Sequence, residues 1–265
     1  MPDSGDYIMN DAAGDREVAR LRANETWMDE HTKSQLAATG LDSGWRCLEV
    51  AAGAGSIARW LGECVGSAGT VCAVDVNTRF LTDLPANVTV VEHDITTGPP
   101  EHAAFDLVHS RALLEHLPDP ATALEQMCAA VRPGGWLVVE SGDLGLLQFS
   151  GNDRADEATS AMHTLLQWAR DAGYLDCYFG RRLPGMFRSL GLADVEVSTL
   201  TATGGYGDPA FLTLALGWTP GGDHLSAMGM ELDDAAVGSI DAVFVDPASH
   251  LVLMTMFGSR GRRPE

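Results

Sequence analysis

The segment Cys47-Leu-Glu-Val-Ala-Ala-Gly-Ala-Gly-Ser-Ile-Ala58 decides the fold of this chain. A strand-like run carries the carboxylate of Glu49, continues through small residues and opens into a helical pattern. Gly53 and Gly55 let the backbone approach a ligand closely, and the first turn of the helix presents unpaired N–H groups. The segment therefore predicts a ligand-binding loop between a strand and a helix.

Strand and helix patterns alternate on both sides of this loop. Helical patterns begin near residues 55, 77 and 119, and short apolar runs predict strands at 46–50, 70–75, 88–93, 105–110 and 136–141. Strands separated by helices of this size are typical of βαβ units. We therefore predict an α/β fold whose core is a doubly wound, mostly parallel sheet.

The composition excludes several classes of protein. The 265 residues include 17 Lys and Arg against 37 Asp and Glu, and the net charge of −20 repels a phosphate backbone. No apolar run approaches the roughly 18 residues of a membrane-spanning helix. Residues 1–20 lack a basic start and an apolar stretch, and the five cysteines form no disulfide or metal-ligand pattern. We expect a cytoplasmic protein with no metal, no membrane partner and no nucleic-acid partner.

The chemistry of the ligand depends on Glu49. The spacing Gly53-x-Gly55-x-x-Ala58, with Asp75 about 20 residues further on, also satisfies the fingerprint of a dinucleotide-binding loop. A carboxylate at position 49 would repel a pyrophosphate, but it suits a ligand that carries an ammonium group and a sulfonium. The charge favours S-adenosylmethionine (SAM), and an oxidoreductase that binds NAD(P) remains the alternative.

Two further acids follow the next predicted strands. Asp75 ends the run Val71 to Asp75, where its carboxylate can accept hydrogen bonds from both hydroxyls of a ribose; the alternative is an N-cap of the following helix. Asp94 follows the third strand, so its carboxylate can meet an amino group while Ile95 meets an aromatic face. An ordinary turn aspartate is the alternative at this position.

A set of short motifs runs along the chain: Glu49 to Gly55, Asp75, Asp94-Ile95, Phe105-Asp106, Leu114 to Pro120 and Val131 to Leu137. Together they resemble the class I SAM-dependent methyltransferases, and the similarity covers residues 46–141. The helix with Trp27 and the segments 181–193 and 251–262 are similar, less specifically, to a group of bacterial, often natural-product-associated, small-molecule methyltransferases.

The resemblance implies a seven-stranded Rossmann-like fold with helical cap insertions. It implies an N-terminal helical lid (1–40), a SAM-binding core (41–150), and a cap or acceptor region with the last strands (151–265). It also implies transfer of a methyl group from SAM to an O, N or C atom of a small, partly apolar acceptor, with S-adenosylhomocysteine as product. The implied cofactor contacts are Trp27, Glu49, Ala51, Gly53, Gly55, Asp75, Val76, Asp94, Ile95 and Ser110.

One residue departs from the family pattern. The family usually has glycine where this chain has Ala51. Alanine does not easily take a positive φ, so we expect either a right-handed conformation at this residue or an altered loop. An altered loop would favour an enzyme that keeps the fold but catalyses a cyclisation or rearrangement without consuming SAM.

Methyl transfer from a sulfonium is an in-line displacement on an activated donor, so positioning of the acceptor is the main task of the protein. A base is needed only when the acceptor is a protonated amine, a hydroxyl or a weakly acidic carbon. His116 follows the fourth strand and is the candidate for that role. A packing or hydrogen-bonding role for His116 is the alternative.

The regions outside the core are predicted to complete the site. Tyr7 and Trp27 lie on a segment that we expect to close over the cofactor, where an aromatic face favours a sulfonium. Most aromatic and methionine residues after position 150 are expected in the hydrophobic core, and a minority in an acceptor pocket. A homodimer and a non-catalytic partner subunit with the same fold are left open.

Overall fold

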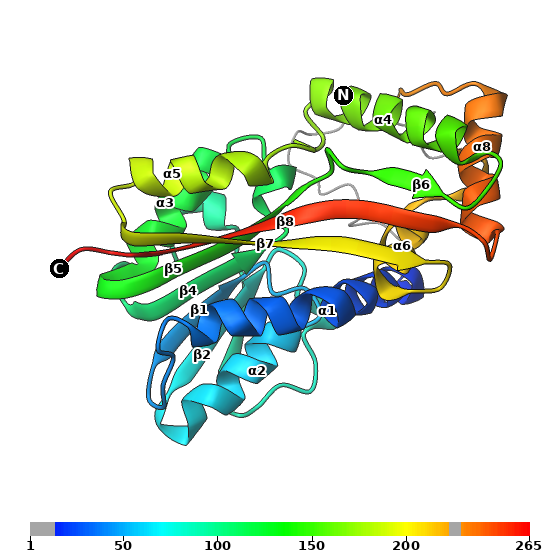
Figure 1. Cartoon of the computed structure of the whole chain (residues 1–265). Coiled ribbons are helices and arrows are strands. Elements are labelled where there is room, and N and C mark those ends of the chain that lie inside the picture. The colour runs from blue at the N-terminus through cyan, green and yellow to red at the C-terminus, as the bar shows by residue number, and fades with distance from the viewer. Residues whose placement is uncertain (1–13, 223–228) are drawn as a thin grey trace. The chain divides into compact units, whose positions relative to one another are not determined.

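The computed structural model describes residues 14–222 and 229–265 (Figure 1). The chain divides into two compact units, each assembled from separated segments. Unit 1 comprises Met1–Trp27, Gly142–Tyr178 and Thr201–Met256, and unit 2 comprises Met28–Ser141, Phe179–Leu200 and Phe257–Glu265. Tyr7, predicted to belong to a lid, lies outside the described residues. The functional division into lid, core and cap stays a prediction.

Unit 2 contains the predicted parallel sheet. Its first four strands are β1 (Arg46–Val50), β2 (Thr70–Asp75), β3 (Val88–Glu92) and β4 (Phe105–Arg111). The fifth, β5 (Val131–Asp143), continues into unit 1. All neighbours in the order β3-β2-β1-β4-β5 pair in parallel. The predicted doubly wound α/β class is confirmed.

Helices cover both faces of the sheet in unit 2 (Figure 1). Leu36 of α1 (Gly14–Ala37) and Leu61 of α2 (Ser56–Val65) pack in one buried cluster with Cys47 and Leu107 of the strands. The opposite cluster joins Leu48 and its strand neighbours to α3 (Pro120–Ala130) and α5 (Leu183–Ser189). Alternate strand residues therefore serve opposite faces, as the period of a strand requires.

The remaining strands complete the sheet. These are the three-residue β6 (Gln148–Ser150), β7 (Ala193–Gly205) and β8 (His250–Arg262). Both β6 and β7 pair with β8, and β6 is antiparallel to it. Among the residues that the structure describes, the sheet has eight strands, because the short β6 is added to the seven that the family resemblance predicts.

The helices of unit 1 enclose an aromatic core. They are α4 (Ala155–Asp171), α6 (Pro209–Gly217), α8 (Asp234–Val245) and the start of α1. The ring of Phe244 makes edge contacts with Phe149 and Phe211, at centroid distances of 5.6 and 5.8 Å. Trp218 and Phe211 are buried, as predicted for most aromatic side chains in this region. Within the described residues, no helix combines the length and the apolar character that crossing a membrane requires.

Candidate functional site

The carboxyl ends of the parallel strands bring the candidate residues to one edge of the sheet in unit 2. In the strand register, Glu49 of β1 lies beside His109 of β4, and Arg111 of β4 lies beside Glu140 of β5. Asp75 is the last residue of β2. Ligands of open parallel sheets bind outside the carboxyl ends of the strands. This edge is therefore the candidate site.

The glycine loop makes a sharp turn between β1 and α2. Ala51, Gly53 and Gly55 have φ angles of +57°, +57° and +85°. A Cβ atom at Gly55 would lie 3.1 Å from side-chain atoms of Leu81 and Leu84, so both conformation and space favour glycine there. The expected right-handed conformation at Ala51 is wrong: the alanine takes the left-handed conformation that glycine takes easily, at a cost of about 1–2 kcal/mol.

Asp75 ties the end of β2 to this loop. Its Oδ2 accepts a hydrogen bond from the Gly53 N–H at 2.9 Å, and its Oδ1 accepts one from the Asn77 N–H at 2.9 Å. Burial raises the pKa of Asp75, although the bonds from these backbone N–H groups act in the opposite direction. The N-cap of the next 3-10 turn (Thr78–Phe80) is Asn77, so Asp75 does not have the alternative role of a cap for that turn. Val76, the next residue, is 54% exposed.

Asp94 and Ile95 follow β3. The Asp94 carboxylate uses one oxygen, Oδ1, to accept hydrogen bonds from the Thr96 N–H and the Thr96 hydroxyl, so it caps the turn Ile95–Thr97. The Ile95 side chain is buried in the cluster that α3 covers. The turn role of Asp94 is thus present in the structure, and the adenine contact of both residues stays a prediction.

A buried ionic network lies behind the loop. Glu49 Oε2 is 2.7 Å from His109 Nδ1, and Glu140 Oε2 is 3.5 Å from His109 Nε2, an ion-pair distance. Glu49, His109 and Glu140 are 4%, 0% and 1% exposed. Burial alone would lower the pKa of His109, but the charges of the two carboxylates and the hydrogen-bonded contact with Glu49 raise it to about 9. The raised pKa favours the protonated form of His109, between the two carboxylates, at neutral pH.

Helix α1 contributes side chains that contact the Glu140 end of this network. Its residues His31 and Thr32 contact the Glu140 carboxylate, with His31 Nδ1 at 2.8 Å from Oε1. Burial would raise the pKa of Glu140, but its bonds to His109 and His31 hold that pKa well below its usual range. Arg111 donates to Thr32 Oγ1 at 2.8 Å and to Asp29 Oδ1 at 3.0 Å.

Asp29 extends the network to the loop. Its Oδ1 accepts a hydrogen bond of 3.1 Å from the hydroxyl of Ser56, the first residue of α2. Glu140, His31 and Asp29 were not among the residues predicted from the sequence. A signal was present for Glu140, since a carboxylate inside an apolar strand-like run is rarely buried unless it is paired.

The other predicted site residues have different surroundings. The Ser110 side chain is fully buried and its Oγ has no hydrogen-bond partner among the described residues, and its contact with the cofactor stays a prediction. His116 is partly buried on the single turn Leu114–His116 that follows β4. Trp27 belongs to unit 1, where its indole N–H donates to Thr213 Oγ1 at 3.1 Å.

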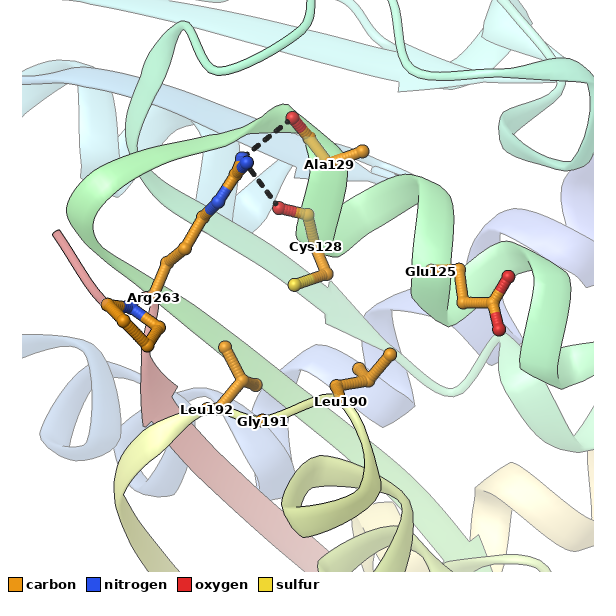
Figure 2. A pocket seen from close by; sticks show the side chains of 8 residues that line it. Glu125, Cys128, Ala129, Leu190, Gly191, Leu192 and Arg263 are labelled. Carbon is orange, nitrogen blue, oxygen red and sulfur yellow. Dashed lines mark hydrogen bonds between the residues drawn. The ribbon is translucent and has the colours of Figure 1, made fainter.

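A surface hollow of about 450 Å³ lies at the opposite edge of unit 2 (Figure 2). It is formed by the end of α3, by residues 190–192 just before β7, and by Arg263. The Arg263 guanidinium donates to the carbonyl oxygens of Cys128 and Ala129 at 3.4 and 3.2 Å, and so satisfies the end of α3. We assign this hollow a structural role, because it adjoins the amino ends of the strands and not the glycine loop.

Comparison with known proteins places the chain in a family. A family profile described as "Methyltransferase domain" matches residues 19–197, which is more than half of the chain and includes the whole glycine loop and the ionic network. The chain belongs to the class I SAM-dependent methyltransferases. This membership removes the NAD(P)-dependent oxidoreductase that the glycine spacing alone had left open.

One curated relative of this methyltransferase is "Methyltransferase str3" of Strobilurus tenacellus. It is 31% identical over 69% of this chain and 66% of its own length, so the match spans about two thirds of each protein. In fold, the chain is similar to phosphoethanolamine N-methyltransferase 2 of Haemonchus contortus solved with SAM. That similarity has a TM-score of 0.61 at 16% identity, over 100% of this chain and 61% of the other.

A third similarity is to a protein with a different activity in its name. The 4+2 cyclase SpnF shares the fold with a TM-score of 0.55 at 18% identity, over 89% of this chain and 80% of that one. At such low identities the likeness concerns the fold alone.

In the described ranges 14–222 and 229–265, no group of three or more His, Cys, Asp or Glu side chains is arranged to hold a metal ion.

Proposed function

We propose that this protein transfers a methyl group from SAM to an O, N or C atom of a small, partly apolar acceptor of the secondary-metabolite kind. The observation that carries the proposal is the joint geometry of Asp75 and the glycine loop. The Asp75 carboxylate is anchored beside the loop by the backbone N–H groups of Gly53, Asn77 and Val76. A carboxylate offers about four lone-pair sites, so Asp75 can still accept a hydrogen bond from a ribose hydroxyl.

The remaining cofactor contacts follow from this anchor. Gly53, Gly55 and Ala51 present backbone to the methionine part of SAM, and Glu49 supplies a carboxylate for its ammonium group. Val76, Asp94 and Ile95, at the ends of β2 and β3, are assigned to the adenine. Ser110 is assigned a further contact. These assignments match carboxylates to hydrogen-bond donors and the exposed side chain of Val76 to an aromatic ring, while the buried Ile95 would lie beneath it.

Bound SAM would supply an activated methyl group, and the chain supplies orientation. Holding the acceptor in line with the methyl carbon contributes roughly 7–11 kcal/mol to lowering the barrier. His116 is our candidate base for an acceptor that must lose a proton, because it follows β4 at the same edge of the sheet. A small acceptor agrees with the net charge of −20, which disfavours nucleic acid.

Calorimetric titration with SAM and S-adenosylhomocysteine tests the cofactor. We expect micromolar binding by the wild type and a loss of about tenfold or more in Asp75→Asn, because the ribose loses charged hydrogen bonds. The control is Glu101→Gln, which removes the same charge from an exposed residue that precedes β4. Absence of binding by well-folded wild type would refute the proposal and favour a partner subunit.

A cyclase or rearrangement enzyme that does not consume SAM is the second candidate, supported by the fold shared with the 4+2 cyclase. The argument for a cyclase from an altered loop is weakened, because Ala51 takes the left-handed conformation that glycine takes easily. Release of S-adenosylhomocysteine with the native substrate distinguishes the two reactions, because a cyclase forms none.

A further inference from the structure

His109 and Glu49 form a pair whose geometry is fixed by the sheet. They are register neighbours on β1 and β4, and Glu49 Oε2 and His109 Nδ1 are 2.7 Å apart. Both side chains are almost fully buried. Neither strand can slide without breaking the parallel ladder, so the imidazole holds the Glu49 carboxylate in one orientation.

The charged groups nearest to His109 lie on β1, β4, β5 and α1. Glu49 on β1 and Glu140 on β5 flank the ring, while Arg111 on β4 contacts Asp29 and Thr32 of α1. His31 of α1 contacts the far oxygen of Glu140. Two buried carboxylates on either side of one imidazole ring would repel each other strongly if that ring were neutral. The imidazolium removes that repulsion and leaves one net negative charge on the trio of Glu49, His109 and Glu140.

The second oxygen of the Glu49 carboxylate is the group that can carry the remaining negative charge to a ligand. His109 occupies one oxygen of Glu49, Oε2, so the carboxylate can offer its other oxygen to a ligand. Glu49 precedes the glycine loop by two residues, at the carboxyl end of β1. An ammonium group held against the loop would be attracted to this oxygen, whereas a ligand without an ammonium group would gain nothing from it.

We propose that His109 is a positioning residue that orients Glu49 toward the ammonium group of the cofactor, so that recognition of the amino-acid part of the cofactor depends on His109. The inference rests on the proposed function, because it takes SAM as the cofactor. An orienting role of His109 affects the affinities for two ligands differently, whereas a purely structural role would affect both alike. Affinity for S-adenosylhomocysteine depends on His109, and affinity for 5′-methylthioadenosine, which lacks the amino-acid part, does not.

The test is calorimetric titration of both ligands into wild type and His109→Gln. We expect the affinity for S-adenosylhomocysteine to fall about 10- to 100-fold and the affinity for 5′-methylthioadenosine to change less than about twofold. His102→Gln is the matched control, since His102 is exposed on the loop before β4. Its affinities for both ligands should equal those of the wild type.

A second variant keeps the inference testable if His109→Gln does not fold. Glu49→Gln removes the carboxylate that we propose for the ammonium group but leaves His109 beside Glu140. It should show the same selective loss for S-adenosylhomocysteine. An equal loss for both ligands, or unchanged S-adenosylhomocysteine affinity in either folded variant, would overturn the inference. If the wild type binds neither ligand, the proposed function itself fails.

Discussion

Raising the pH should destabilise this protein in part through one buried side chain, His109. The pKa of His109 is about 9 in the folded state, compared with 6.5 for an unperturbed histidine. A raised pKa means that the folded state binds the proton more tightly than the unfolded state does. The stabilisation is therefore complete below pH 6.5 and is lost as the pH rises through 9. The difference in pKa corresponds to about 3 kcal/mol of unfolding free energy.

Urea unfolding of wild type and His109→Gln between pH 6 and pH 10 measures this contribution. The difference in unfolding free energy between the two proteins should shrink by about 3 kcal/mol across that range, because only the wild type loses the proton. His102→Gln should follow the wild type at every pH. If the curves of wild type and His109→Gln stay parallel, His109 is not the buried imidazolium inferred from its two carboxylate neighbours.

Three further predictions concern the loop and the thiols. Ala51→Gly should raise the unfolding free energy by up to about 1 kcal/mol, since relief of the left-handed strain exceeds the entropy cost of glycine; a lower melting temperature would contradict this. Gly55→Ala should cost about 1 kcal/mol or more and weaken SAM binding, because it adds a Cβ in a left-handed, crowded position; wild-type affinity and stability would count against it. Cys47 and Cys177 should resist a thiol reagent at pH 8 until the protein unfolds, because burial raises the pKa of both thiols, that of Cys177 to about 12; rapid native labelling of either thiol would contradict the structure.

Local sequence patterns were sufficient to predict the core of the fold. Apolar runs, a glycine-rich turn and acids at strand ends predicted the strands and the edge at which Glu49 and Asp75 lie. The hydrogen bond between Asp75 and Gly53 also follows from that order, because adjacent parallel strands end side by side. These features depend on neighbouring residues and on a chain topology that a small set of general rules restricts.

The ionic network could not be predicted in the same way. The pairing of Glu49 with His109 depends on the register between β1 and β4, and the position of Glu140 depends on the register of β5. His31 comes from a helix more than 100 residues away from Glu140. Of the two alternatives for Ala51, the right-handed conformation is wrong because the loop as a whole, and not the preference of alanine, determines φ there, and the altered loop stays a prediction.

The burial of the imidazolium of His109 also determines how the protein responds to dissolved salt. Mobile ions weaken attractions between charges that water surrounds, over a Debye length of about 8 Å at physiological ionic strength. They do not enter the 2.7 Å contact between Glu49 Oε2 and His109 Nδ1, because the ring of His109 is fully buried. The positive charge that balances Glu49 belongs to the His109 side chain and not to a mobile ion. The orientation of Glu49 should therefore persist in concentrated salt that disrupts exposed ion pairs.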